Sequence, residues 1–319
     1  MASVATHRIG MPPRAADAAA RSRRAGERWV PWVLLAPVLI VMNVVGIYPL
    51  LHALYVSFTG LKPTDPDQFQ GFVGAANYAR ALGDLTFWNA IGLTLLFTLV
   101  SVVVSLTLAV LLAVLFNKPY PGFVLLRTIL LIPMLITPIA VGITWRIMMM
   151  PDVGVLNYLL GGLGIPPLTW ASSKAGALAS VLLVDIWQWT PFIFIIVFAG
   201  LRALPKSPFE AAAIDGASPS YTFFAVTLPM LKPVILIAVM LRIIDAMRTF
   251  DTVYIITRGG PDFASDLASI YLQRVNFRFF DLGYGSAMAW LLLALILVIV
   301  IGFAQLSGFA RLIEHREGA

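Results

Sequence analysis

Four ionisable residues interrupt a long apolar stretch in the second half of the chain. They are Arg242, Asp245, Arg248 and Asp251, spaced three apart and alternating in sign. Side chains three apart on a helix are neighbours, so each carboxylate lies within reach of a cation. Ionisable residues are costly inside a membrane and are functional candidates by default. Such carboxylates can bind the hydroxyl groups of a ligand, relay a proton or ion, or pair with arginine to hold helices together.

On one continuous helix this series would not face a single cavity. Each step of three residues turns the helix by about 300°, so the series winds about halfway round it. We therefore expect Arg248 and Asp251 to form a structural charge ladder. For Asp245, a ligand contact and a structural ion pair both remain open.

A second polar cluster interrupts the preceding apolar stretch. Asp185, Gln188, Trp189 and Phe192 share one face of a helix by the three-and-four spacing rule. Sugars suit such a face, because their hydroxyl groups bond to carboxylates and amides while their C–H faces pack on aromatic rings. The alternative is a structural ion pair for Asp185, and tryptophan alone is weak evidence because it is common in membrane proteins.

These residues must be positioned by membrane-spanning helices. The chain has 319 residues, of which 60% are hydrophobic and 12% charged, whereas soluble domains carry about 25% charged residues. The predicted fold is an all-α integral membrane protein with six spans of about 20 apolar residues or more. The spans lie near 32–58, 89–116, 128–150, 178–200, 233–257 and 284–307, and Pro37 and Pro49 should kink or tilt the first.

Basic residues indicate the topology. Lysine and arginine are concentrated in the N-terminal tail, the loops after the second and fourth spans and the C-terminal tail. The positive-inside rule therefore predicts that both termini are cytoplasmic. Residues 1–30 are then a disordered basic tail without a cleaved signal peptide, 31–310 the membrane domain and 311–319 a short cytoplasmic tail. The net charge of +6 reflects topology and not binding to nucleic acid.

The sequence carries no pattern for catalysis or for a bound metal ion. It has no P-loop motif and no cysteine, and its three histidines, His7, His52 and His315, are scattered. We therefore expect no catalytic residue, metal site or cofactor in this chain, and no enzyme activity by the chain alone.

A polar insert, residues 201–229, separates the fourth and fifth predicted spans. Ser207 and Glu210 have the spacing of a capping box, with Pro208 at the first helical position. Gly216 suits the left-handed residue that ends a helix, and Ser218 with Pro219 repeats the start signal. The pattern predicts a helix–glycine–helix docking element on the cytoplasmic surface.

This insert resembles the EAA loop through which the permeases of ABC importers engage their ATPase. Glu210, Ala211, Ala212, Gly216, Leu228 and Pro229 fall in register with the family pattern, and Val226 stands where isoleucine is usual. The resemblance implies ATPase coupling by these residues together with Asp215 and Ala217. A capping role alone remains the alternative for Glu210.

Other segments resemble the carbohydrate-uptake branch of these permeases, the branch of the maltose and glycerol-3-phosphate systems. They are residues 127–133, Pro138, Trp145, and residues 154–157, 250–254 and 257–261. The chain looks like the first permease of an unlike pair. It lacks the large external domain that some relatives insert.

The resemblance implies import of a sugar or sugar derivative across a bacterial inner membrane by alternating access. The implied partners are a second permease, an extracytoplasmic solute-binding protein, the lipid bilayer and an ABC ATPase dimer, which carries the ATP and Mg. It also implies a substrate site made of Asp185, Gln188, Trp189, Phe192, Arg242, Asp245 and Thr249. Whether the ligand is anionic stays open.

Three other functions remain to be distinguished. A secondary transporter could use Asp245 or Asp185 as a proton or ion relay, and its uptake would need no ATPase and would collapse with an ionophore. A non-transporting scaffold could be deleted without loss of uptake. An amino-acid or peptide importer is the nearest rival within the ABC class, and a neighbouring gene for a sugar-binding protein would argue against it.

Overall fold

The structure, a computed structural model, describes residues 30–64, 70–118 and 120–308. It divides into two compact units, Met1–Val56 and Ser57–Ala319. The described part of the first unit contains α2 (Val30–Val41), a π-helical segment η1 (Met42–Ile47) and most of α3 (Tyr48–Ser57). A π-helical segment lies between Pro37 and Pro49, and the kink or tilt expected at these two prolines stays a prediction.

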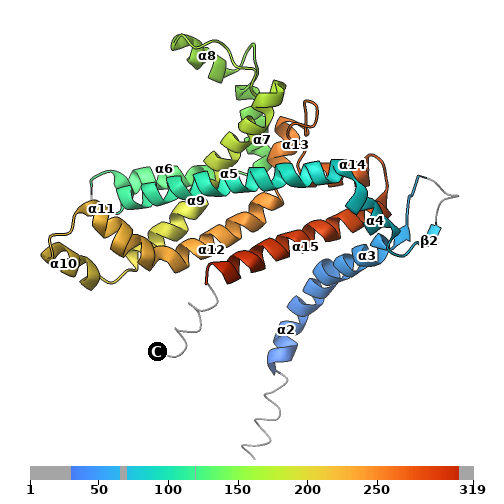
Figure 1. The fold of residues 1–319 in the computed structure, drawn as a ribbon, viewed down its shortest axis with the longest axis horizontal. Helices are drawn as coiled ribbons and strands as arrows, with labels where there is room; N and C mark the ends of the chain where they lie inside the picture. Colours follow the sequence, from blue (N-terminus) through green and yellow to red (C-terminus); the bar gives the residue numbers. More distant parts are fainter. Residues whose placement is uncertain (1–29, 65–69, 119, 309–319) are drawn as a thin grey trace, which may run out of the picture. The chain divides into compact units, whose positions relative to one another are not determined.

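The second unit is almost entirely helical (Figure 1). Its one described sheet pairs β1 (Thr59–Gly60) antiparallel with β2 (Gln70–Phe72). Its helices are α4 (Ala76–Gly83), α5 (Leu85–Phe116), α6 (Phe123–Leu135), α7 (Pro138–Met148), α8 (Val155–Gly162), the 3₁₀ turn η3 (Trp170–Ser172), α9 (Lys174–Arg202), α10 (Ser207–Ile214), α11 (Pro219–Tyr221), the π-helical segment η4 (Thr222–Thr227), α12 (Leu228–Met247), α13 (Asp251–Ile256), α14 (Ala268–Phe277) and α15 (Leu282–Leu306).

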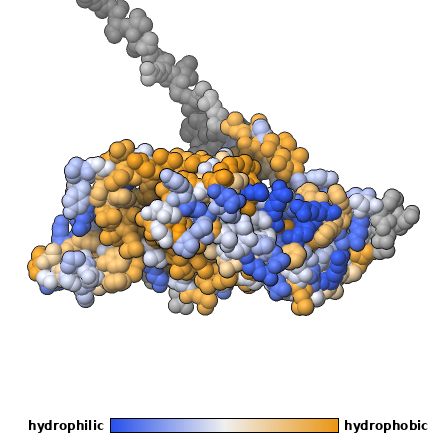
Figure 2. All heavy atoms as spheres, turned by 90° about the horizontal axis from the view of Figure 1, so that it is seen from above, coloured by the Kyte–Doolittle hydropathy of each residue, from blue (hydrophilic) through white to orange (hydrophobic). Residues whose placement is uncertain are grey.

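Five helices of the described chain are long and apolar enough to cross a membrane. They are Pro31–Ser57, Leu85–Phe116, Lys174–Arg202, Pro219–Met247 and Leu282–Leu306. Four of them agree within a few residues with predicted spans. The surface in Figure 2 is hydrophobic over much of the visible face, as expected for helices that meet lipid or a partner.

The predicted span at 128–150 is not one straight helix. It is the pair α6 and α7, which are bent by 97° at the break between them. Ile136 and Thr137 adopt extended backbone conformations there, with ψ of 135° and 140°. Pro138 accounts for the conformation of Thr137, because a proline disfavours the helical conformation in the residue before it. The count of six spans therefore depends on whether the bent pair crosses as one span, and it stays a prediction.

The predicted span at 233–257 is misplaced. One continuous helix runs over Pro219–Met247, through α11, η4 and α12. The expected second short helix of the insert is therefore the start of this span. The helix ends at Met247, and α13 forms a separate short helix. Ser269 donates a hydrogen bond to the carbonyl of Thr249 in this break at 2.5 Å, a contact that the apolar pattern does not reveal.

The core of the second unit lies between α5, α9, α12 and α15. One cluster of buried side chains joins α5, α12 and α15 around Phe87, Val239 and Met288. Another joins α5, α9 and α12 around Ala109, Val197 and Leu231. In Figure 1, α10 and α14 lie at opposite ends of these long helices. The bundle thus places the polar insert at one end and the charged residues of α9 and α12 in its interior.

Candidate functional site

The interior of the bundle holds one arginine between two carboxylates. The side chain of Arg242, on α12, is fully buried. Its Nη2 donates hydrogen bonds to Asp185 on α9 and, at 2.7 Å, to Ser101 on α5. Its Nη1 donates to Asp245, three residues along the same helix, at 2.8 Å. Three helices that are far apart in the sequence therefore meet at one guanidinium group.

The two carboxylates differ in exposure. The side chain of Asp185 is 1% exposed, whereas that of Asp245 is 35% exposed. The Ser101 hydroxyl donates to Asp185 as well, so serine and arginine together satisfy the buried carboxylate. Asp245 is thus the member of this cluster that a ligand can reach without unpacking the helices.

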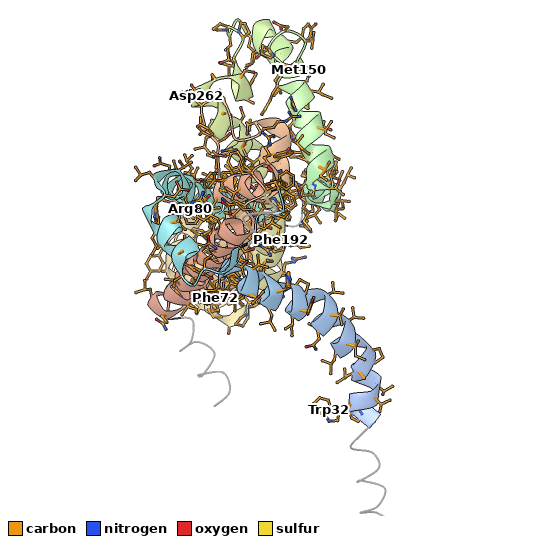
Figure 3. All side chains as sticks on the ribbon, turned by 90° about the vertical axis from the view of Figure 1, so that its right-hand side faces the viewer. Trp32, Phe72, Arg80, Met150, Phe192 and Asp262 are labelled. Atoms are coloured by element: carbon orange, nitrogen blue, oxygen red, sulfur yellow. The ribbon has the colours of Figure 1, made fainter. Side chains whose placement is uncertain are left out.

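The other members of the predicted face on α9 have separate surroundings. Gln188 is 1% exposed, and its Nε2 donates at 3.1 Å to the carbonyl of Ile136 in the bend between α6 and α7. The half-buried ring of Trp189 lies 5.8 Å from Cζ of Arg242 and 6.2 Å from the ring of Phe192, which Figure 3 labels. Gln188 therefore supports the bend, while the aromatic side chains retain accessible surface.

The predicted charge ladder stops at Asp245. Arg248 lies just beyond the end of α12 and Asp251 begins α13, so the two do not continue one helical series. Both are exposed, and neither has a salt-bridge partner in the described part of the chain. The two residues therefore do not continue the series on one helix, and a structural role for them stays a prediction. Thr249 lies in the break and donates a long hydrogen bond, 3.4 Å, to the carbonyl of Asp245.

Ser101 is the member of the cluster that the sequence analysis missed. A single serine in an apolar span is a weak signal. Its helix does carry a regular series of small hydroxyl residues, however, at Thr94, Thr98, Ser101 and Ser105, and all four are buried. That three-and-four spacing marks one face of α5 as polar and could have indicated that the face packs against other polar groups.

The polar insert has a locally determined geometry. Gly216 follows α10 with φ of 71°, the left-handed conformation that favours glycine. The amide of Ala217 donates to the carbonyl of Ala212 at 2.9 Å, and that of Gly216 to Ala213 at 3.2 Å. This pair of bonds is a Schellman motif. Ser218 then caps the next helix by accepting from the amide of Tyr221.

The start of α10 differs from the prediction. Lys206, not Ser207, is the N-cap, and no side chain caps the helix. The expected capping box of Ser207 and Glu210 is therefore absent, and the backbone amide of Glu210 bonds instead to the carbonyl of Lys206 at 3.1 Å. Because Lys206 is in the helical conformation, the chain enters the helix one residue earlier than a capping serine would allow.

The remaining residues of the EAA-like pattern lie on both sides of Gly216. Ala212 is buried, whereas Glu210, Ala211, Asp215 and Pro229 are exposed and Ala217 and Leu228 are half-buried. Glu210 has no salt-bridge partner among the described residues. The ordered turn thus presents exposed polar groups that have no ion-pair partner among the described residues, and such groups are available for contact with another protein.

No group of three or more potential metal ligands among histidine, aspartate and glutamate occurs in the described ranges.

Long apolar helices that enclose a buried ion pair define a helical protein that crosses the membrane several times. Comparison with known families agrees. Residues 27–317 match the family of binding-protein-dependent transport system inner membrane components, and the chain belongs to this family.

Curated relatives cover most of this chain. It is 41% identical over 287 residues to the probable ABC transporter permease protein y4oQ of Sinorhizobium fredii, covering 90% of this chain and 92% of that protein. It is 36% identical to the trehalose/maltose transport system permease protein MalF of Thermococcus litoralis, with coverage of 89% and 96%. It is 35% identical to the sulfoquinovosyl glycerol transport system permease protein SmoG of Agrobacterium fabrum, with coverage of 85% and 87%.

A solved structure has the same fold. A chain of a bacterial alginate ABC transporter, in complex with an alginate pentasaccharide-bound periplasmic protein, matches with a TM-score of 0.78 and 20% sequence identity. The match covers 89% of this chain and 96% of that chain.

Proposed function

We propose that this chain is one of two unlike permease subunits of an ABC importer for a sugar or sugar derivative. The family match over residues 27–317 is the observation that carries the proposal. Relatives named for trehalose/maltose and sulfoquinovosyl glycerol transport support the class of solute. In this assignment a separate ATPase dimer binds ATP and Mg, and an extracytoplasmic binding protein delivers the solute.

The cluster around Arg242 divides into residues that hold helices and residues that meet the solute. Arg242, Asp185 and Gln188 are buried and bonded to protein groups, so they position α5, α9 and α12. Asp245 and Thr249 retain exposure and can accept hydrogen bonds from sugar hydroxyls, with Trp189 and Phe192 as packing surfaces. This assignment narrows the seven residues of the predicted substrate site to four that a ligand can reach.

The insert acts as the coupling element in this proposal. α10 and the Gly216 turn contact the ATPase and lead directly into the continuous helix Pro219–Met247. The C-terminal end of that helix carries Arg242 and Asp245, so motion of the turn is transmitted along one continuous helix to the solute site. Glu210 supplies an exposed charge for the contact. Alternating access then follows ATP binding and hydrolysis in the partner subunit, with both termini of this chain in the cytoplasm of a bacterial cell.

The decisive experiment measures ATPase activity of the reconstituted assembly with its binding protein. Neutral sugars, polyols, sugar phosphates, sulfonates and amino acids are compared as stimulants. We expect one sugar class to stimulate hydrolysis and Glu210→Ala to abolish the stimulation. Thr107→Ala, which removes an exposed hydroxyl on α5 outside the insert, should preserve it. Stimulation by amino acids alone would show that the assembly is an amino-acid importer and not a sugar importer. Uptake without an ATPase, collapsed by an ionophore, would establish a secondary transporter.

A second experiment separates the two roles within the cluster. Asp245→Asn should raise the solute concentration needed for half-maximal stimulation while the assembly stays intact. Asp185→Asn should lower thermal stability, because it weakens a buried ion pair. The opposite pattern would reverse the assignment of the two carboxylates.

A further inference from the structure

A pocket with polar and aromatic walls lies away from the Arg242 cluster and from the insert. It has a volume of about 500 Å³ and is formed by the start of α5, the segment before α14, and α14 with the residues that follow it. In Figure 1, α14 lies at the end of the long helices opposite α10. The volume falls in the range of small-ligand sites, about 300–1,000 Å³.

One arginine holds the interior of this pocket together. Nη1 and Nη2 of Arg274 donate to the two carboxylate oxygens of Asp266 at 3.1 and 2.6 Å. Cζ of Arg274 lies 5.0 Å from the centre of the Phe263 ring and 5.9 Å from that of Tyr271. All four side chains line the pocket. A carboxylate, a guanidinium group and two aromatic rings are therefore held at fixed spacing by direct contacts.

The charges of the pocket cancel. The side chain of Asp266 is 3% exposed and that of Arg274 is 16% exposed, so the ion pair lies at the base. No other charged side chain among the described residues lines the pocket. An anion would meet the carboxylate and a cation would meet the guanidinium group. The pair thus suits a neutral ligand whose hydroxyl groups both donate and accept hydrogen bonds.

The wall on α5 adds two neutral polar groups. Thr86 and Asn89 are three residues apart on this helix and therefore lie on one face of it. Both residues are exposed, and neither side chain has a hydrogen-bond partner within the described part of the chain. An amide and a hydroxyl group supply donors and acceptors together. These groups are free to bind a ligand.

The opposite rim presents exposed aromatic rings. Phe263 is 59% exposed and Phe279 is 60% exposed. Phe263 adopts a φ of 61° and Asp262 before it a φ of 48°, the left-handed region that residues other than glycine rarely occupy. The amide of Asp266 donates to the carbonyl of Phe263 at 3.2 Å and holds this conformation. Backbone strain that presents an exposed aromatic side chain is typical of functional sites.

We propose that this pocket is a second saccharide-binding site, specific for an uncharged sugar unit. The rings of Phe263 and Phe279 pack on the C–H faces of the sugar, and Asn89, Asp266 and Arg274 bind its hydroxyl groups. The role of the site rests on the proposed function: if the insert meets the ATPase, the opposite end of the bundle is extracytoplasmic. The site then receives the solute before it reaches Asp245.

The test is saturation-transfer difference NMR of the purified assembly in lipid nanodiscs, without the binding protein. The probes are trehalose, maltose and trehalose 6-phosphate, and all variants carry Asp245→Asn to weaken binding at the Arg242 cluster. We expect both neutral sugars to bind and the phosphorylated sugar to bind more weakly. Phe263→Gly and Asn89→Ala should each raise the dissociation constant roughly 2- to 10-fold, by the loss of one packing contact or hydrogen bond.

These variants separate binding from folding. Glycine adopts a positive φ without strain, and alanine favours the helix at an exposed position of α5. The two changes lie on opposite walls, so a shared loss of affinity does not come from one distorted loop. Phe277→Ala is the control, because it removes an equally exposed ring of α14 that does not line the pocket.

Three results would overturn the proposal. The first is sugar affinity that neither Phe263→Gly nor Asn89→Ala changes, as expected if the aromatic rim meets lipid. The second is tighter binding of trehalose 6-phosphate than of trehalose, which would assign an anion site. The third is weaker docking of the binding protein in Phe263→Gly with unchanged sugar affinity, which would assign a protein contact.

Failure of this site and failure of the proposed function are distinguishable. Sugar-stimulated ATPase activity together with the first result would refute the pocket and leave the importer assignment intact. Sugar binding that is sensitive to Phe263→Gly, without sugar-stimulated ATPase activity, would support the pocket and refute the importer assignment.

Discussion

The Gly216 turn and the Arg242 cluster are built in opposite ways. The turn is made by residues within about one helical turn of each other, and its bonds run between backbone groups five or three positions apart. The cluster joins residues 57 and 141 positions apart through side chains. Local bonds survive a rearrangement of the helices, whereas the cluster exists only when three helices are packed. The Gly216 turn therefore keeps its conformation when the helices shift, whereas the Arg242 cluster keeps α5, α9 and α12 packed together.

The largest effect is expected from removing the cation of the Arg242 cluster, which tests whether this cluster holds the three helices together. Arg242→Met should destabilise the assembly by about 3–5 kcal/mol, because it leaves the buried Asp185 without a partner charge. The measurement is the thermal unfolding midpoint and the yield of monodisperse protein. Adding Asp185→Leu should restore part of the stability, since a buried ion pair replaced by apolar side chains is often tolerated. No recovery in the double variant would refute the ion-pair explanation.

Loss of the linking hydroxyl should have a smaller effect. Ser101→Ala removes one donor to Asp185 and one acceptor for Arg242, so we expect a loss of roughly 2 kcal/mol. Thr107→Ala on the same helix is the control, because its exposed hydroxyl bonds only to the carbonyl of Val103 within its own helix. If both variants have the same unfolding midpoint, Ser101 does not take part in the cluster.

Substitutions at Gly216 should affect transport through the backbone conformation that they allow and not through the volume of the new side chain. No atom lies within 4 Å of a Cβ placed on Gly216, so a side chain has space, but its positive φ penalises a β-branched residue by about 1–2 kcal/mol. Gly216→Val should therefore reduce transport per ATP hydrolysed and lower the free energy of unfolding by no more than about 1–2 kcal/mol. Gly216→Asn should be tolerated, because asparagine adopts the left-handed conformation. Equal activity of the two variants would contradict a conformational role.

Asp84 combines local and tertiary bonding in one residue. It caps α5 by accepting from the amides of Thr86 and Phe87, and it also accepts from the hydroxyls of Tyr271 and Tyr284. Burial acts to raise its pKa, but the hydrogen bonds from Tyr284 and Tyr271 and from the two amides outweigh burial. The pKa of Asp84 therefore lies below its usual value.

The contribution of the Asp84 carboxylate to the stability of the fold should accordingly be lost only at acidic pH. A carboxyl with a lowered pKa stabilises the fold above its unfolded pKa of about 4, and this stabilisation disappears as pH falls through the folded value. The stability difference between the wild type and Asp84→Asn should be constant from pH 5 to pH 8. It should shrink as the pH falls from 5 toward 3.5, because the folded-state pKa lies below the unfolded one. A difference that already varies near neutral pH would exclude this origin.

The contrast between the turn and the cluster also separates what could be predicted from what could not. The left-handed Gly216 and the cap at Ser218 follow from glycine and serine chemistry over a few residues, and both occur. The capping box at Ser207 does not form, because the chain becomes helical one residue earlier. The end of α12 was placed ten residues too late, since apolar character continues through α13 while the helix does not.

By itself, the amino-acid sequence determined that this is a helical membrane protein, where most of its apolar helices lie, and that a glycine turn separates two of them. These properties depend on hydrophobicity and backbone preference, which act over short distances along the chain. The tertiary structure alone decided which charges are buried, that Ser101 joins Asp185 to Arg242, and that Asp245 keeps an accessible face. The reason is physical: burial and ion pairing depend on which helices pack together, and residues far apart in sequence carry no record of that packing.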